Sequence, residues 1–323
     1  MKYFLFCFLA LILWNCGQEK SETTTSDLVP IERLDRTLMA MESKADLETF
    51  LEKNSWYSRN LYRAFPDDTA FVNHLYYIIS HPSTKAFYQE VDSTFGELSE
   101  LRKELTNAFS EIQKTYPSFD PPKVYATFTG LENDIFVSDS LIIIALEAFM
   151  GPSGTYRPDQ PAYILSRYQK EYIVPSIIRL LGQSYISSTN ASDMLTNMIY
   201  LGKSFEFTKT MLPCVADSLI IAMPDSSLQS NWYAQDLIWA HFVDKKLLYE
   251  QNPRVKEKYL GERPTTSEIG PSCPGRIAQW LGWRIADKFR TENPDVSFKE
   301  FMQLENAQKI LRLSKYRGIV EEE

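Results

Sequence analysis

Histidine is scarce in this chain: three occur in 323 residues, at positions 74, 81 and 241. None has a second ligand at the spacing of a local metal site, so the sequence holds no HExxH motif and no local two-histidine site. The GxSxG, P-loop and GxGxxG motifs are absent as well. We therefore expect no catalytic residue, no metal and no cofactor. A Ser-His-Asp triad assembled from distant residues stays open.

Positive charge is in the minority, because 34 lysines and arginines stand against 42 aspartates and glutamates, and the formal net charge is −8. This sign argues against nucleic acid or an anionic bilayer surface as the partner. Beyond residue 26 there is no internal repeat and no run of prolines or glycines that would mark a linker. We therefore expect one globular domain over residues 27–323.

The apolar run at the N-terminus, Tyr3 to Trp14, is too short to cross a membrane. As a helix it would span about 18 Å, whereas the hydrocarbon core is about 30 Å thick. With Lys2 before it and Cys16 after it, the run resembles a bacterial lipoprotein signal peptide, which implies removal of residues 1–15 and a lipid on Cys16. An ordinary secretory signal cut within Gly17 to Ser26 is the alternative, and both imply export.

Cysteine is sparse in the part of the chain that would remain after export. Residues 17–26 contain no apolar side chain, so we expect residues 16–26 to form a flexible tether. Of the four cysteines, only Cys214 and Cys273 belong to the expected globular body. An exported protein permits a disulfide, but pairing depends on a Cα separation that the sequence does not give, so it stays open.

Hydrophobic spacing predicts an α+β fold that is mainly α-helical. Apolar residues recur at helical spacing in seven stretches. These are residues 31–41, 96–116, 175–183, 194–212, 237–248, 277–285 and 298–317, the last as a helix pair or a bent helix. Between the second and third stretches, residues 123–130, 134–137 and 141–146 have strand-like patterns. They predict a small antiparallel β-meander packed on helices, with LIIIAL (141–146) as its central buried strand.

The segment PSCPGRIAQWLGWRI, residues 271–285, is rich in the residue types that dominate binding hot spots. Trp280 shares a helix face with neighbouring apolar residues, which predicts core packing, and Gly282 would let another backbone come close. Arg276 and Trp283 project differently on a helix. For these two residues the pattern alone does not decide between core packing and binding. We expect them to form an exposed anchor for a partner.

The same segment carries a family resemblance. PGRIAQWLGWRIADKF, residues 274–289, resembles the helix near the C-terminus of the gliding-motility lipoproteins of the GldB family, with their PGR-[IV]-x-x-W-[IL]-G-W-x-I pattern. Further stretches are similar to the family in the same order. They are Val29–Leu38, Leu141–Gly151, Glu171–Pro175, Met198–Lys203, Asn231–Tyr249 and Ala307–Arg317. The chain departs from the family pattern at Ala145 and Glu147, where Gly and Asp are usual.

The resemblance implies a lipid-anchored envelope protein, facing the periplasm from a membrane that the sequence does not identify. It would support gliding and the associated type IX secretion machinery as a non-enzymatic interaction protein, with protein components of that apparatus as partners. The motifs nominate five interaction residues in addition to the lipidated cysteine. They are Glu147, Lys203, Arg276, Trp283 and Arg284.

Two alternatives to an interaction protein stay open. The order of sheet, central helix and late helix is similar to a zincin-like layout without its metal. This would imply a degenerate peptidase with residual hydrolytic use of Glu147 or Asp193, or else a metal-free hydrolase. A solute-binding lipoprotein is the other alternative, although the chain lacks the pattern of two domains joined by a hinge.

Overall fold

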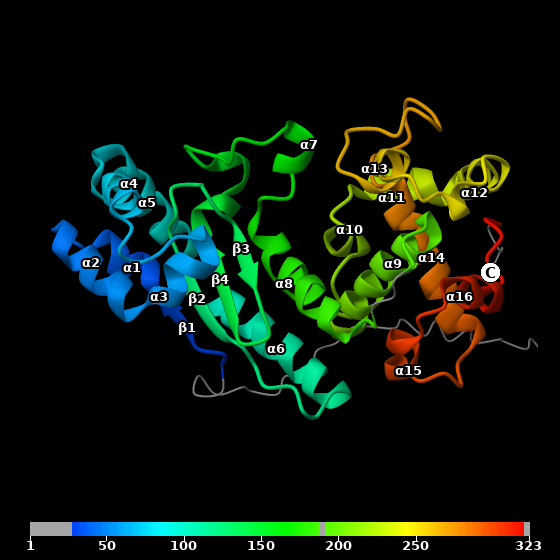
Figure 1. The fold of residues 1–323 in the computed structure, drawn as a ribbon, viewed down its shortest axis with the longest axis horizontal. Helices are drawn as coiled ribbons and strands as arrows, with labels where there is room; N and C mark the ends of the chain where they lie inside the picture. The colour runs from blue at the N-terminus through cyan, green and yellow to red at the C-terminus, as the bar shows by residue number, and fades with distance from the viewer. Residues whose placement is uncertain (1–27, 188–190, 320–323) are drawn as a thin grey trace, which may run out of the picture.

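The computed structural model describes residues 28–187 and 191–319 (Figure 1). The expected signal peptide, Cys16 and the tether lie outside these residues. Within the described part of the chain, no helix is both long enough and apolar enough to cross a membrane.

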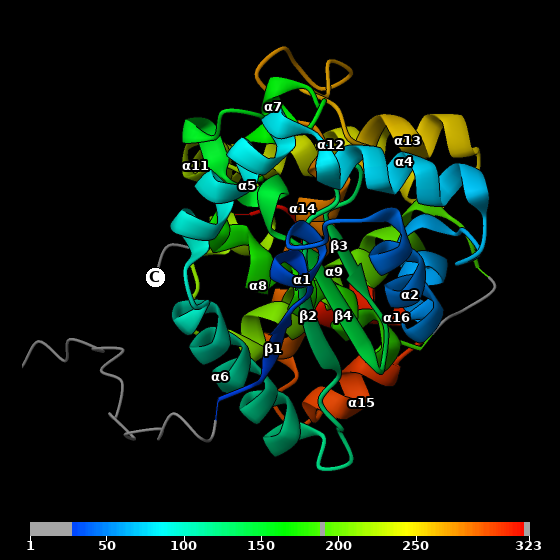
Figure 2. The ribbon, with the colours of Figure 1, turned by 90° about the vertical axis from the view of Figure 1, so that its left-hand side faces the viewer.

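The fold contains a four-stranded sheet in the order β1-β2-β4-β3. The strands are β1 (Ile31–Arg33), β2 (Lys123–Thr127), β3 (Ile135–Val137) and β4 (Leu141–Ala145). Ile142, Ile143 and Ile144 of β4 are fully buried, which confirms the expected inner strand. A strand with isoleucine on both faces is covered from both sides, and Figure 2 shows α1 and α2 in front of the sheet from one side.

The expected antiparallel meander is wrong in its topology. Strand β2 pairs with β4 in parallel, with Val124 opposite Ile142, and β1 pairs with β2 in parallel. Only β3 is antiparallel, because it forms a hairpin with β4 whose turn is closed by the bond from Ser138 N to Leu141 O (2.8 Å). After β2 the chain therefore crosses to the far side of β4, and the sheet is mixed.

Strand β1 also replaces the start of an expected helix. Residues 31–33 pair with β2, and the helix α1 begins only at Leu34. Helical spacing over a single turn is a weak signal, and the backbone pairing with β2 outweighs it.

The helices of the N-terminal part lie mostly on one side of the sheet (Figure 1). They are α1 (Leu34–Met39), α2 (Lys44–Lys53), α3 (Ser55–Tyr57), the π-helix η2 (Ser58–Tyr62), α4 (Thr69–Ser80), α5 (Pro82–Phe95) and α6 (Ser99–Thr115). Ser43 and Asp68 cap α2 and α4 with their side chains, as Ser and Asp do at helix starts. The α6 bounds agree with the helix expected within residues 96–116.

The remaining helices pack on the other side, with α8 between the sheet and α9, and α14 beyond α9. The 3₁₀ turns are η3 (Leu146–Phe149), η4 (Gly151–Ser153), η5 (Lys170–Tyr172), η6 (Gln183–Tyr185) and η7 (Leu247–Tyr249). The α-helices are α7 (Ala162–Leu165), α8 (Ile173–Gly182), α9 (Met194–Met211), α10 (Asp217–Ile220), α11 (Asp225–Tyr233), α12 (Gln235–Asp244), α13 (Pro253–Leu260), α14 (Ile277–Glu292), α15 (Phe298–Gln303) and α16 (Ala307–Ser314). Residues 298–317 thus contain a helix pair.

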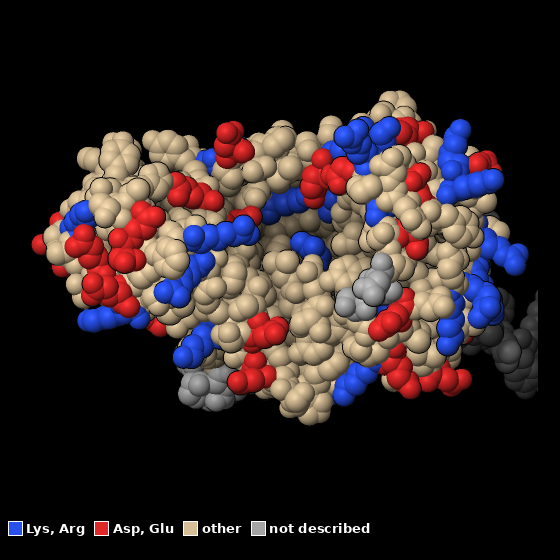
Figure 3. All heavy atoms as spheres, viewed as in Figure 1, with Lys and Arg blue, Asp and Glu red and all other residues tan. Residues whose placement is uncertain are grey.

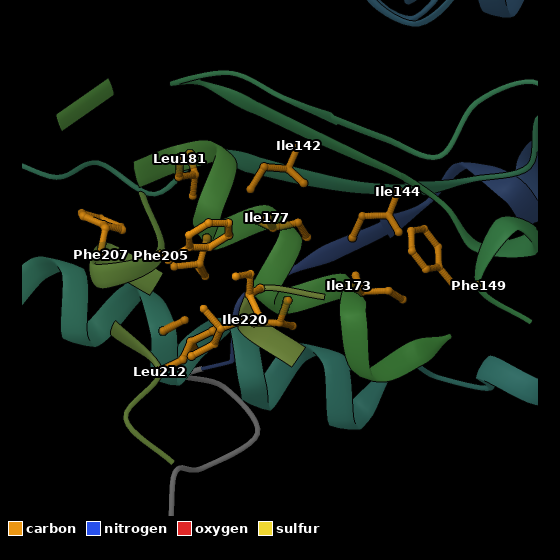
Figure 4. Close-up of a cluster of buried hydrophobic side chains, with 14 of the residues drawn as sticks. Ile142, Ile144, Phe149, Ile173, Ile177, Leu181, Phe205, Phe207, Leu212 and Ile220 are labelled. Atoms are coloured by element: carbon orange, nitrogen blue, oxygen red, sulfur yellow. The ribbon is translucent and has the colours of Figure 1, made fainter. Parts of the chain in front are cut away.

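The core joins the sheet to these helices. Figure 4 shows Ile142 and Ile144 of β4 beside Ile177 of α8, and Phe205 of α9 belongs to the same cluster. All four side chains are buried to at least 99%. At about 25 cal/mol per Å² of buried apolar area, such side chains stabilise the fold by roughly 1.5–3 kcal/mol each.

Two glycines allow α9 and α14 to cross in backbone contact. A Cβ at Gly282 would lie within 3.0 Å of the Met198 carbonyl group, and a Cβ at Gly202 would lie equally close to the Gly282 carbonyl group. Real Cβ atoms do not approach neighbours this closely. The close approach expected at Gly282 is therefore confirmed, and the neighbouring backbone is that of α9.

Candidate functional site

Most of the expected interaction residues are buried. The exposed fractions are 6% for Arg276, 3% for Trp283, 2% for Lys203 and 0% for Glu147. The expectation that Arg276 and Trp283 form an exposed anchor is therefore wrong. Of the five, Arg284 alone has part of its side chain at the surface, 18% exposed.

Trp283 is buried because α14 is covered on more than one side. This helix contacts α9, α13 and α16, so its buried side chains are not confined to one face. The Trp283 Nε1–H donates to Glu206 Oε1 (2.7 Å), and its ring packs against Phe205 with centroids 5.5 Å apart. Glu206 Oε2 in turn accepts from Arg290 Nη1 (3.1 Å). The indole thus satisfies a buried carboxylate, while Trp280 is core as expected.

Helix α9 carries two buried charged side chains, which corrects the expectation of one apolar face. Lys203 Nζ donates to the carbonyls of Met302 (3.1 Å) and Leu304 (2.5 Å) and lies 5.2 Å from the centre of the Phe301 ring. Burial lowers the pKa of Lys203 to about 8. These contacts tie α9 to the end of α15, so this lysine acts inside the fold.

Arg276 joins three loops at the start of α14. Its backbone is left-handed, with φ at 60°. Its guanidinium donates to the carbonyls of Ile221 (2.9 Å) and Ala222 (2.5 Å), and its Nε lies 3.4 Å from Glu262 Oε1. Burial, reinforced by the nearby Arg167, lowers the pKa of Arg276 to about 10.

Two further arginines, Arg167 and Arg179, lie near Glu262. Arg167 Nη1 lies 2.7 Å from Glu262 Oε1, and Arg179 of α8 interacts electrostatically with both Arg167 and Arg276. We call Arg167, Arg179, Arg276 and Glu262 the arginine cluster. Figure 3 shows a hollow in the middle of one face, between α7–α8 and α10–α13, with blue cationic side chains inside it. Sequence reasoning missed Arg167 and Arg179, because no local motif links them to Arg276.

Glu147 lies in η3, two residues after the end of β4, and is fully buried at the carboxyl ends of β2 and β4. Its Oε1 accepts from Thr129 N (2.6 Å), Thr129 Oγ1 (2.8 Å) and Leu131 N (3.2 Å), while Oε2 has no hydrogen-bond partner among the described residues. Burial raises the pKa of Glu147 to about 7, against the lowering effect of these donors. The carboxyl group therefore fixes the loop after β2.

The pH dependence of stability should report this carboxyl group. Below the usual pKa of 4.5 it is neutral in both states, but between 4.5 and about 7 the folded state keeps a proton that the unfolded chain releases. The free energy of unfolding of the wild type, measured relative to that of Glu147→Gln, should therefore decrease by roughly 3 kcal/mol over this pH range and remain constant above it. Urea unfolding of both proteins at several pH values tests this, and a pH-independent difference would contradict it.

The two residues nominated for hydrolysis both accept hydrogen bonds within the fold. Asp193 caps α9 and accepts from Thr196 N (2.9 Å), whereas Glu147 is committed to the loop after β2. In the two described ranges, no group of three or more His, Cys, Asp or Glu side chains could hold a metal ion. His241 contacts Tyr259 Oη through Nε2 (3.0 Å), as expected for a satisfied boundary histidine.

Cys273 is a free and buried thiol, so it does not pair with Cys214. Its Sγ lies 3.8 Å from Pro274 O, and burial raises the pKa of the thiol to about 11. A thiol with so high a pKa is protonated at neutral pH and is a poor nucleophile.

Large apolar side chains are exposed where α11 meets α12. The exposed fractions are 39% for Trp232, 71% for Tyr233 and 68% for Leu237, which begins the stretch 237–248 that was expected to be helical. The Arg284 guanidinium lies 5.2 Å from the centre of the Trp232 ring. Trp232, Arg284 and Ile319 also line a surface cavity of about 280 Å³. We call Trp232, Tyr233, Leu237, Arg284 and Ile319 the α11–α12 surface.

The histidine, carboxylates and thiol described above make contacts within the fold, while the α11–α12 surface presents large apolar side chains to solvent. No curated protein and no solved structure matches the chain. The family model described as gliding motility protein GldB matches residues 16–318, which is nearly the whole chain. The chain therefore belongs to the GldB family of gliding motility lipoproteins.

Proposed function

We propose that this protein is a non-enzymatic docking lipoprotein of the gliding machinery and of the type IX secretion apparatus tied to it. In this proposal a lipid on Cys16 anchors it to a membrane, the tether of residues 16–26 follows, and a single domain of residues 27–323 faces the periplasm. The membership of nearly the whole chain in a gliding motility family supports the cellular role.

The α11–α12 surface is the observation that carries the docking role. Trp and Arg dominate binding hot spots, and here Arg284 lies over a tryptophan that is 39% exposed. Tyr233 and Leu237 leave two further apolar side chains mostly in solvent close by in the chain. Grouped exposed apolar residues are typical of surfaces that bind another protein. The proposed partner is accordingly a protein component of the motility or secretion apparatus.

Truncation of Trp232 should abolish gliding without unfolding the protein. Because this side chain is 39% exposed, we expect Trp232→Ala to change the free energy of unfolding by about 1 kcal/mol or less. Loss of a hot-spot tryptophan typically costs at least about 2 kcal/mol of binding. The measurement is a melting curve beside a gliding assay in cells that carry the variant.

Phe65→Ala is the matched control, since Phe65 is a second exposed aromatic residue with an arginine, Arg59, 5.6 Å from its ring centre. Cells with this variant should glide. Cys16→Ser should release the protein from membranes, or leave the uncleaved signal as a poor anchor, and should also stop gliding. The docking proposal fails if Trp232→Ala cells glide like wild type, and the anchoring proposal fails if the mature N-terminus lies downstream of Cys16 and carries no lipid.

A further inference from the structure

The arginine cluster carries an excess of positive charge at one place on an acidic protein. Its three guanidinium groups and one carboxylate leave a local charge of +3 − 1 = +2, whereas the whole chain has −8. Within the described residues, Glu262 is the one carboxylate that forms an ion pair with any of these arginines. The excess is therefore not balanced by the cluster's own side chains.

Arg179 is the member with the least compensation. It lies on α8 and is partly buried, and its guanidinium has no hydrogen bond or ion pair with another described residue. Burial and the repulsion from Arg167 lower the pKa of Arg179, although Glu262 opposes this effect. Arginine stays charged in proteins, so an incoming anion would relieve this repulsion.

The contacts of Glu262 show how an oxyanion fits here. Its Oε1 is shared by Arg167 Nη1 (2.7 Å) and Arg276 Nε (3.4 Å), and the glutamate side chain is 45% exposed. Arg276 is fixed by two backbone carbonyls, so its position does not depend on a ligand. The Glu262 carboxylate thus already bridges Arg167 and Arg276 from the solvent side. Arg179 has no carboxylate partner among the described residues.

We propose that the arginine cluster binds a small oxyanion with two negative charges, a phosphate or a dicarboxylate, with Arg179 as its main new contact. Guanidinium groups bind both kinds of oxyanion through paired hydrogen bonds. Two negative charges would neutralise the +2 of the cluster. Figure 3 shows a hollow between α7–α8 and α10–α13, and the cluster comes from these elements, since Arg179 lies on α8, Arg167 follows α7 and Glu262 follows α13. This inference goes beyond the docking role and does not depend on it.

Calorimetric titration of the purified full-length chain in detergent tests the site, with inorganic phosphate in one arm and succinate in the other. Binding of either anion supports the proposal, and the tighter one identifies the ligand class. Arg179→Gln should raise the Kd about tenfold or more, because a hydrogen bond to a charged group contributes about 1.5–3 kcal/mol. Arg312→Gln, on the exposed side of α16, is the matched control and should leave the Kd unchanged.

Glu262→Gln provides a variant with the opposite expected effect. This glutamate competes with the ligand for the same arginines, so its neutralisation should lower the Kd by several-fold. Melting curves of all variants check that they fold. The proposal is overturned if neither anion binds the wild-type chain at 10 mM. A Kd of 10 mM corresponds to a binding free energy of about −2.7 kcal/mol. It is equally overturned if Arg179→Gln binds as well as wild type does.

Discussion

Gly282→Ala is expected to destabilise the protein by about 2 kcal/mol or more, although alanine is the better helix former. In a helix interior alanine is favoured over glycine by about 1 kcal/mol. The added Cβ would lie within 3.0 Å of the Met198 carbonyl group, which belongs to the α9 backbone and cannot turn away as a side chain can. Overpacking of this kind typically costs about 3 kcal/mol at its upper end, so the clash outweighs the helix propensity.

Gly270→Ala is the control for this substitution. A Cβ at Gly270 would meet nothing within 4 Å, and its backbone is not left-handed. This variant should unfold at the wild-type denaturant concentration or slightly above it, because alanine reduces the entropy of the unfolded chain. Urea unfolding of both variants gives the comparison. Equal stability of Gly282→Ala and wild type would show that α9 and α14 do not cross in backbone contact.

Trp283→Ala is expected to lower the free energy of unfolding by roughly 3–5 kcal/mol, the usual cost of removing a large buried aromatic side chain. A second loss adds to this, because Glu206 Oε1 would lose the indole N–H that lies 2.7 Å away. A buried carboxylate without its donor costs about 1–3 kcal/mol. The total approaches the whole stability of a typical domain, so the variant should be largely unfolded at 37 °C.

Trp283→Phe separates the two losses, since it keeps most of the packing and removes only the donor. It should cost roughly 1–3 kcal/mol and remain folded. Chemical denaturation followed by circular dichroism measures both variants. A folded and stable Trp283→Ala would contradict the burial of this side chain and would restore it as a candidate surface anchor.

Hydrophobic spacing predicted several of the long helices but missed α2, α4, α5, α11 and α13, and it did not predict the neighbours of the strands. Residues 96–116 and 194–212 became α6 and α9 within a few residues of the expected bounds, because long periodic segments give a strong local signal. The partner of β2 has no local signal. Strand β4 lies beside β2 although β3 comes between them in sequence, so the pairing joins residues that are not neighbours along the chain.

The functional residues were harder to predict than the fold. The motif of α14 is rich in tryptophan and arginine, and composition alone does not distinguish a hot spot from a core that contains polar groups. Trp283 has a buried polar partner, Glu206, located 77 positions away on α9, which the sequence of α14 does not reveal. The arginine cluster likewise combines residues from α8, the start of α14 and two loops.

Photocrosslinking in gliding cells tests the proposed docking surface most directly. A photoreactive amino acid at position 237, on the α11–α12 surface, is compared with the same amino acid at position 65. The native side chains there are exposed to nearly the same extent, 68% for Leu237 and 66% for Phe65. We predict that position 237 crosslinks to a protein of the motility or secretion apparatus and that position 65 does not. No crosslink from position 237, or the same products from both positions, would contradict a docking role for this surface.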